Sequence, residues 1–162
     1  NEYDLSTAWD VSSASFSHSF SVSAQETSPA DVFFDSTGSK MYIIGFTGDA
    51  VFEYDLSTAW DISTAAYLQS FDTSPQETSA SSLFFKPDGK KMYVVGTSGD
   101  DVNEYDLSTA WDVTSASYLQ NFSTAGQSSR MDGIYFHPDG TQMFLVTPIE
   151  DAIYTYSLGV QE

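Results

Sequence analysis

Hydrophobic and polar residues alternate strictly along SFSHSFSV, residues 15–22. Serines fill every second position, and the positions between them hold Phe16, His18, Phe20 and Val22. Successive side chains of a β-strand point to opposite faces, so this pattern predicts a strand with one face covered and the other in water. We therefore expect an outer, half-exposed strand over residues 15–22.

Other segments are apolar on both faces. Leu83–Phe85 and KMYVVG, residues 91–96, are nearly continuous apolar runs, which is typical of strands buried between neighbours. The Pro-Asp-Gly sequence between them, residues 87–89, is a strong signal for a hairpin turn. A third strand over 102–107 alternates, and one of its faces carries Asn103, Tyr105 and Leu107. Burial thus falls from the first strand to the fourth, as in a propeller blade that runs from channel to rim.

This pattern recurs along the chain. The nonapeptide EYDLSTAWD occurs three times with a spacing of 51 residues, at positions 2–10, 53–61 and 104–112. We divide the single domain 1–162 into repeats 2–52, 53–103 and 104–154 and a partial repeat 155–162. Self-similarity at this period indicates a solenoid or a propeller. The sequence predicts an all-β fold, a β-propeller of four-stranded antiparallel blades, with about three blades and a partial blade per chain.

The number of strands bears on how the propeller closes. The chain carries the third and fourth strands of one blade, two sets of four, and then a first, second and third strand. Propellers typically need four to eight blades to close. We therefore expect head-to-tail association between copies, because such a contact forms a ring when the rotation permits. A dimer with six blades is favoured over a trimer with nine, although NEYDL and IYTYSL then compete for one strand position at each junction.

The stretch FKPDGKKMYVVGTSGDDVNEYDL, residues 85–107, resembles the YVTN-type β-propeller repeat. In that repeat a Pro-Asp-Gly turn precedes an aromatic-aliphatic strand, and a Gly/Asp loop leads to a third strand. The first repeat departs from the pattern at residues 35–38, Asp-Ser-Thr-Gly, and the STAWD insertion lies outside it. The resemblance implies a propeller. It implies no particular function, because one fold serves many roles.

Composition narrows the range of partners. The 162 residues carry 23 acidic side chains against 5 lysines and arginines, a formal net charge of −18. Such a chain repels phosphate backbones and anionic lipids, so we expect no nucleic acid and no membrane partner. Cysteine is absent, which removes disulfides and thiol chemistry. The acidic, serine-rich composition favours an extracellular location.

Three tryptophans at equivalent positions are candidate ligand-binding residues: Trp9, Trp60 and Trp111. One hypothesis makes them stacking platforms for sugars, one pocket per blade. The alternative is packing between blades, which we favour because large aromatic side chains bury much area and a repeat needs its neighbour to cover its face.

Two sets of loops, which a propeller brings to one face, hold candidate metal ligands. The loops before the first strand of each blade carry Glu26, Asp31, Glu77 and Asp132, and the loops between second and third strands carry Asp49, Asp100 and Asp101. Converging carboxylates suit a hard cation, so Ca²⁺ is the ion we consider. The competing expectation is that the chain binds no cofactor. The other interpretation is ordinary turn chemistry, since Asp-Gly and Gly-Asp are common in turns.

No catalytic motif emerges from the sequence. The two histidines, His18 and His137, stand where the other repeats carry polar surface residues; His18 is equivalent to Gln69 and Gln120. The sequence favours a non-enzymatic binding or assembly module, because equivalent sites suit multivalent binding. Its partners would be further copies of itself, a glycan or a protein. The alternatives are a lactonase-like or hydrolase-like propeller enzyme with a divalent metal in the channel, and a propeller lectin.

Overall fold

The computed structural model describes residues 1–159, and its regular elements are β-strands and three short 3-10 helices. Over these residues the strands number thirteen, as the sequence predicts: β1 (Glu2–Leu5), β2 (Ala14–His18), β3 (Pro29–Phe34), β4 (Lys40–Gly45), β5 (Ala50–Leu56), β6 (Ala65–Asp72), β7 (Ala80–Phe85), β8 (Lys91–Gly96), β9 (Asp101–Leu107), β10 (Ala116–Ser123), β11 (Gly133–Phe136), β12 (Gln142–Thr147) and β13 (Ala152–Ser157). Within this described part, no helix is long and apolar enough to cross a membrane.

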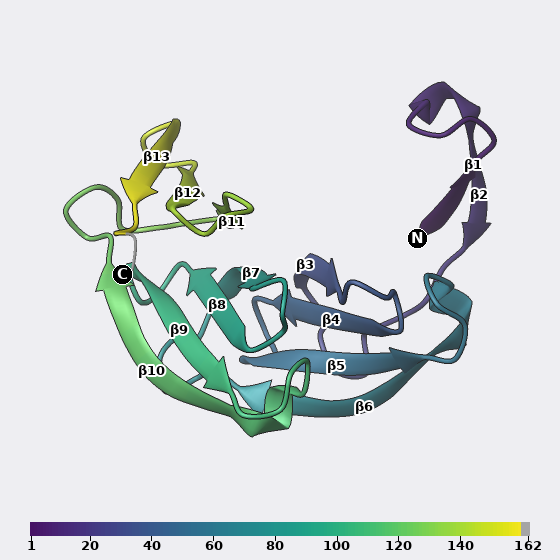
Figure 1. Ribbon diagram of the computed structural model, residues 1–162, viewed down its shortest axis with the longest axis horizontal. Helices are drawn as coiled ribbons and strands as arrows, with labels where there is room; N and C mark the ends of the chain where they lie inside the picture. Colours follow the sequence, from purple (N-terminus) through teal and green to yellow (C-terminus); the bar gives the residue numbers. More distant parts are fainter. Residues whose placement is uncertain (160–162) are drawn as a thin grey trace.

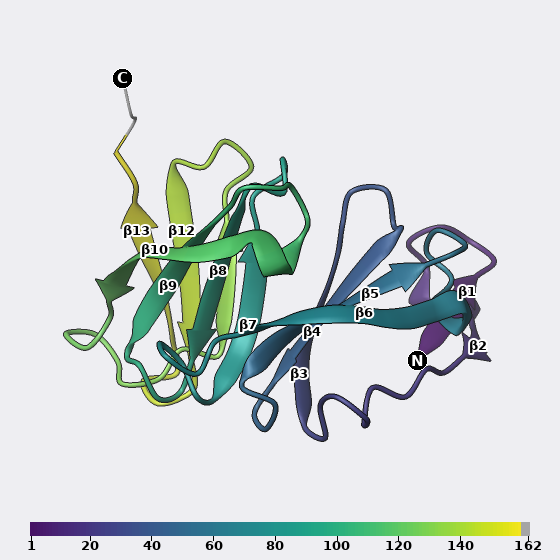
Figure 2. The ribbon, with the colours of Figure 1, turned by 90° about the horizontal axis from the view of Figure 1, so that it is seen from below.

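The strands form four antiparallel sheets. We call β1–β2 the N-terminal pair, β3–β6 the first blade, β7–β10 the second blade and β11–β13 the C-terminal sheet. Figure 1 shows the sheets side by side in an arc, with β3, β7 and β11 toward its inner side and β6 and β10 along its outer side. The N-terminal pair and the C-terminal sheet form the two ends of the arc (Figures 1 and 2). The prediction of an all-β propeller of four-stranded blades is confirmed.

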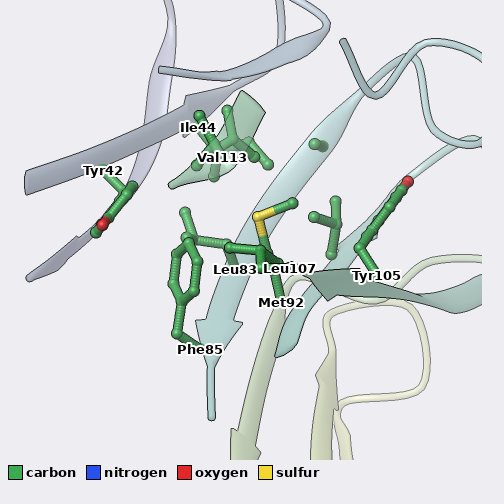
Figure 3. Close-up of a cluster of buried hydrophobic side chains, with 11 residues drawn as sticks. Tyr42, Ile44, Leu83, Phe85, Met92, Tyr105, Leu107 and Val113 are labelled. Carbon is green, nitrogen blue, oxygen red and sulfur yellow. The ribbon is translucent and has the colours of Figure 1, made fainter. Parts of the chain in front are cut away.

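The core lies between the blades, where neighbouring sheets pack face to face. At the junction of the first and second blades, Tyr42, Ile44 and Val51 from one sheet meet Leu83 and Phe85 from the other (Figure 3), and all five are at most 2% exposed. Each blade is too thin to bury both faces by itself. The fold therefore depends on contacts from one blade to the next.

The repeated STAWD segment forms a tight connection between the third and fourth strands. Its aspartate caps a 3-10 helix in each repeat: η1 (Val11–Ser13), η2 (Ile62–Thr64) and η3 (Val113–Ser115). In η2 the Asp61 side chain accepts the Ser63 N–H, as expected of a capping aspartate. The repeated motif thus encodes the outer corner of the blade.

One strand is shorter than the sequence predicts. The alternating segment 15–22 forms a strand only as far as His18. Its partner β1 has four residues, whereas the equivalent β5 has seven, so the second half of the segment finds no ladder to join. Phe16 of this short strand is 61% exposed, and its equivalents in the complete blades, Tyr67 and Tyr118, are 45% and 44% exposed, as expected of an outer strand.

Candidate functional site

The first strands of the blades begin at the inner side of the arc, where the repeats differ in polarity. Residues 29–31 read Pro-Ala-Asp, and the equivalent segments 80–82 and 131–133 read Ala-Ser-Ser and Met-Asp-Gly. Asp31 reaches across to the next blade, where its Oδ2 accepts the Ser82 hydroxyl at 2.7 Å and the Leu83 N–H at 3.1 Å. Asp31 therefore joins two neighbouring inner strands.

The loop before the third inner strand, β11, carries the cation of this region. Arg130 binds Asp132 in a bidentate pair, with Nε to Oδ1 at 2.6 Å and Nη2 to Oδ2 at 2.8 Å. The hydrogen bonds that Arg130 donates to the Asp132 carboxylate raise the pKa of Arg130. The equivalent residues in the other repeats are Ser28 and Ser79, so this pair occurs in one repeat only. We call Asp31, Ser82, Arg130 and Asp132 the inner-strand group, because they lie at equivalent places at or before the starts of the first strands; Asp31–Ser82 and Arg130–Asp132 are two separate contacts.

Two predicted metal ligands, Glu26 and Glu77, are buried at 1% exposure and hold a loop in place. Oxygens of Glu26 accept the N–H groups of Ser28 and Gly48 at 2.6 and 2.8 Å. The Thr47 hydroxyl also donates to Glu26. Burial alone would raise the pKa of Glu26, but these hydrogen bonds outweigh it and lower that pKa. Glu77 holds the equivalent loop of the second blade through the N–H groups of residues 79, 98 and 99.

The other predicted metal ligands also have local partners. Asp49 and Asp100 have positive φ angles of 49° and 52°, and their carbonyl oxygens accept the N–H groups of Thr73 and Thr124. Asp101 is 8% exposed and accepts hydrogen bonds from Asn103 and Asn121. Burial raises the pKa of Asp101, because it disfavours the charged carboxylate.

Among residues 1–159 one group of three side chains could ligate a metal ion together, namely Glu2, His18 and Asp61. None of the seven predicted ligands belongs to it. The structure therefore does not gather the predicted carboxylates into one site, and their hydrogen bonds fit the turn interpretation.

The tryptophans pack on the hairpin turn of their own blade. The indoles of Trp60 and Trp111 lie over Gly38 and Gly89, and the backbone N–H groups of the two tryptophans donate to the carbonyl oxygens of these glycines at 2.9 Å. Trp111 also packs on Phe33 of the preceding blade. Trp9 has no such turn beneath it in the described chain and is 96% exposed. These contacts support the packing interpretation.

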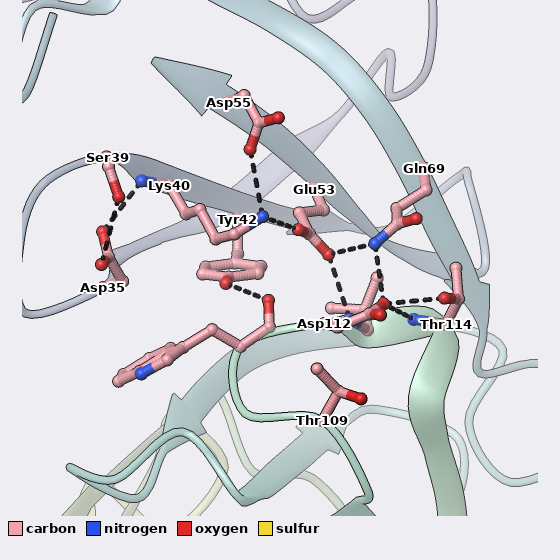
Figure 4. A network of polar contacts seen from close by, with 12 residues as sticks. Asp35, Ser39, Lys40, Tyr42, Glu53, Asp55, Gln69, Thr109, Asp112 and Thr114 are labelled. Atoms are coloured by element: carbon pink, nitrogen blue, oxygen red, sulfur yellow. Dashed lines mark hydrogen bonds and ion pairs between the residues drawn. The ribbon is translucent and has the colours of Figure 1, made fainter. Parts of the chain in front are cut away.

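Sequence reasoning missed a buried polar network at the junction of the two complete blades. Glu53, 0% exposed, accepts hydrogen bonds from Lys40 and Gln69 and from the N–H of Val113 in the next blade (Figure 4). Burial disfavours the Lys40 ammonium, but its bonds to Glu53 and Asp55 outweigh that penalty and raise its pKa. The sequence does carry a signal for this network. Each EYDLSTAWD motif begins with a glutamate, and this charged residue lies in the third strand on a face that is otherwise covered.

The two ends of the arc expose faces that are covered inside it. In the C-terminal sheet Tyr135, Val146 and Ile153 are 57%, 44% and 71% exposed. Their counterparts two repeats earlier include Ile44 and Val51, both fully buried. At the other end a cavity of about 360 Å³ lies on the first blade, beside Asn1 and the segment that follows the N-terminal pair. Its lining includes Phe20, Val22, Val32, Phe34, Met41 and Ile43.

Comparisons with known proteins identify the fold. No protein-family model matches the chain, and no curated protein sequence matches it. A protein of Bacteroides uniformis with a provisional 6-phosphogluconolactonase assignment superposes with a TM-score of 0.65 at 14% identity, covering 98% of this chain and 47% of that one. The periplasmic gluconolactonase of Pseudomonas aeruginosa superposes with a TM-score of 0.62 at 16% identity, covering 82% and 36%.

A third structure, from Bacteroides fragilis and with the same provisional assignment, gives a TM-score of 0.61 at 13% identity, covering 80% of this chain and 34% of its own. At these identities the likeness shows the fold alone. The chain has the fold of a β-propeller segment. It spans less than half the length of the three structures, and membership of the YVTN repeat family stays a prediction.

Proposed function

We propose that the chain supplies blades to a propeller that hydrolyses a sugar lactone. The observation that carries the proposal is the superposition of its blades on three propellers named as gluconolactonases of one kind or another. Hydrolysis of a lactone needs a base to deprotonate the attacking water and a donor to stabilise the charge that develops on the carbonyl oxygen. The inner-strand group offers both kinds of residue.

Within this group Asp31 suits the role of base and Arg130 the role of donor. Ser82 and the Leu83 N–H fix the Asp31 carboxylate, while Asp132 orients the guanidinium by its bidentate contact. The predicted metal carboxylates do not gather within the described chain, so we assign them no role in the proposed reaction. A net charge of −18 disfavours a phosphorylated substrate, so we propose an uncharged lactone.

The ring would be completed by a second copy of the chain, as the strand count suggests. The exposed face of the C-terminal sheet carries the same kinds of residue that the first and second blades bury against their neighbours. The N-terminal pair has the third and fourth strands of a blade, and beside it lies the cavity. Strands β11 and β12 of another copy would supply the missing first and second strands.

This arrangement gives a head-to-tail dimer with six blades, and a trimer with nine is the alternative. In either ring β1 and β13 correspond to the same strand position, so one of them is displaced at each junction. The exposed apolar residues provide the driving force, since burial contributes about 25 cal/mol per Å² of apolar surface. Because every copy of the chain has the same two ends, the junctions between copies in the ring are equivalent.

The first measurement is the solution mass, by light scattering after size exclusion, followed by a lactonase assay on the ring-sized fraction. A mass near twice 17.8 kDa supports the dimer. The assay follows hydrolysis of D-glucono-δ-lactone above its spontaneous rate, with the 6-phosphorylated lactone as the comparison. We expect turnover of the uncharged lactone, and at least a tenfold lower rate in Asp31→Ser and Arg130→Ser.

The second repeat of the chain supplies the residues chosen for these two variants. Each installs the residue that the second repeat carries at the equivalent position, Ser82 or Ser79, so the blade is expected to fold. A ring-sized oligomer without turnover of either lactone would overturn the enzymatic proposal. Unchanged rates in both variants would overturn the assignment of the inner-strand group.

A second candidate function is a non-enzymatic binding or assembly module. The near-identity of the repeats favours it, because equivalent surfaces suit multivalent binding of a glycan or protein. A ring without lactonase activity that binds several glycans per ring would support this candidate. Loss of that binding in Trp9→Ala, which removes the most exposed tryptophan, would support the lectin version.

A further inference from the structure

A cluster of unlike ligands lies where the N-terminal pair meets the first blade. Glu2 in β1, His18 at the end of β2 and Asp61 before η2 each offer one ligand atom, and the three atoms lie within 4.8 Å of one another. Glu2 and His18 are register partners across the β1–β2 ladder, next to a bulge that redirects the side chains. Glu2 and Asp61 are half-buried and His18 is exposed.

The same three positions one repeat later, at the junction of the first and second blades, show how two carboxylates are held together there. There the Gln69 amide lies between two carboxylates, and its Nε2 donates to Glu53 at 2.9 Å and to Asp112 at 2.8 Å (Figure 4). Lys40 adds a positive charge at Glu53. A neutral donor and an ammonium thus hold two carboxylates together across the blade junction.

The first junction lacks both the amide donor and the lysine ammonium. His18 replaces the glutamine, and among residues 1–159 no lysine or arginine forms an ion pair with Glu2 or Asp61. The imidazole cannot reproduce the amide, because its Nδ1 is bonded to the Ser17 hydroxyl at 2.8 Å and one nitrogen remains for two carboxylates. Two acidic side chains are therefore brought together without the positive charge that the next junction supplies.

Each of the three side chains is fixed through one atom and has a second atom to offer. Glu2 Oε2 accepts the Ile62 N–H at 2.9 Å, and Asp61 Oδ1 accepts the Ser63 N–H and hydroxyl at 2.9 and 2.6 Å. Glu2 Oε1, Asp61 Oδ2 and His18 Nε2 make no hydrogen bond within the described part of the chain. Bonds of this kind behind the ligands orient side chains around a metal ion.

We propose that Glu2, His18 and Asp61 form a site for a divalent transition metal ion, with Zn²⁺ as the test ion. One imidazole nitrogen and two carboxylate oxygens suit Zn²⁺, which binds them at about 2.0–2.2 Å and takes water as a fourth ligand. The ion would take the place that the Gln69 amide occupies in the next junction. It would fasten the N-terminal pair to the first blade, because two ligands come from one sheet and the third from the other.

The test uses the full chain without a histidine tag, freed of metal with a chelator and titrated with ZnCl₂ by calorimetry. We expect one Zn²⁺ per chain and a rise in Tm of several degrees when free Zn²⁺ exceeds its Kd about 100-fold. His18→Gln is the decisive variant. It installs the residue found at the equivalent Gln69, so it should lose Zn²⁺ binding at least tenfold while the metal-free Tm stays the same or rises.

His137→Gln is the matched control, because it removes the other histidine of the chain, which contacts Asp139. We expect it to leave the stoichiometry and affinity unchanged. Zn²⁺ binding that survives in His18→Gln, or that disappears in His137→Gln, would overturn the site. So would the absence of measurable binding by the unmodified chain when free Zn²⁺ reaches about 1 mM, since even weak calcium sites have a Kd of about 10⁻⁴–10⁻³ M.

Discussion

The middle of the molecule and its two ends carry similar faces in different surroundings. Val51 and Ile44 of the first blade are fully buried against the second blade, whereas Ile153 and Val146, at the same repeat positions in the C-terminal sheet, are 71% and 44% exposed. The second and third strands pair in the same register in both places, although the C-terminal sheet has no fourth strand. Strand pairing alone therefore does not bury these faces, and the stability of the molecule resides mainly in the junctions between blades.

The largest test of this comparison removes an aromatic ring from the covered junction. Phe85 is 1% exposed and contacts Phe33, Tyr42 and Trp111. We expect Phe85→Ala to lower the free energy of unfolding by about 3–5 kcal/mol, since the ring is lost from a packed core. Urea unfolding followed by circular dichroism measures the loss.

The matched control is Phe34→Ala, the same change at the same repeat position in the first blade. Phe34 is half-buried and lines the open cavity, so we expect about half the loss or less. Both variants should be measured at a concentration where the chain is monomeric. Equal losses in the monomer would contradict the comparison between the covered and the open junction.

A second test concerns the polar part of the same junction. Glu53→Ala leaves the Val113 N–H without its acceptor and removes partners of Lys40 and Gln69. We expect a loss of about 2–3 kcal/mol in the free energy of unfolding, because a buried donor without a partner costs its desolvation. Glu104→Ala is the control. Glu104 binds Lys91 and Gln120, but no bond from the C-terminal sheet reaches it in the described chain, so its loss should be smaller.

A third test uses two glycines with the same backbone conformation. Gly89 and Gly140 have φ angles of 70° and 74°, so replacement by alanine strains the backbone by about 1–2 kcal/mol at both positions. A Cβ at Gly89 would also overlap the indole of Trp111, whereas a Cβ at Gly140 meets no atom within 4 Å. We expect Gly89→Ala to lower Tm clearly more than Gly140→Ala. Equal shifts in a thermal melt would mean that Trp111 moves aside at no cost.

The sequence predicted the number and order of strands well, because alternating and continuous apolar runs depend on local burial that recurs every 51 residues. It favoured packing of the tryptophans between blades; Trp111 contacts Phe33 of the preceding blade, whereas Trp60 covers its own blade and Trp9 is exposed. It could not show that Glu26 and Glu77 hold loops, since a carboxylate that accepts backbone N–H groups and one that binds a metal look alike in sequence. The Glu2–His18–Asp61 cluster was missed because its members are 16 and 43 residues apart along the chain.

The smallest expected effect is a difference between the first blade and the C-terminal sheet in how their stability depends on pH. Hydrogen bonds from Thr47, Ser28 and Gly48 lower the pKa of Glu26 below its model-peptide value of 4.5. A lowered folded-state pKa means that this carboxylate stabilises the fold above about pH 4.5 and loses that contribution as pH falls through the folded-state value. The residue at the equivalent position of the C-terminal sheet is Ser128, which bonds to Thr147 and has no charge to lose.

We therefore expect urea midpoints to fall between pH 6 and pH 3.5, and to fall less in Glu26→Gln, which is less stable at pH 6 but has one acid-sensitive group fewer. Glu150→Gln, a change at an exposed loop glutamate, should keep the pH dependence of the unmodified chain. If Glu26→Gln kept that dependence as well, the loop would not depend on the Glu26 carboxylate. The acid sensitivity of the chain would then come from other carboxylates. Glu26 of the first blade would contribute no more to the pH dependence of stability than Ser128 of the C-terminal sheet.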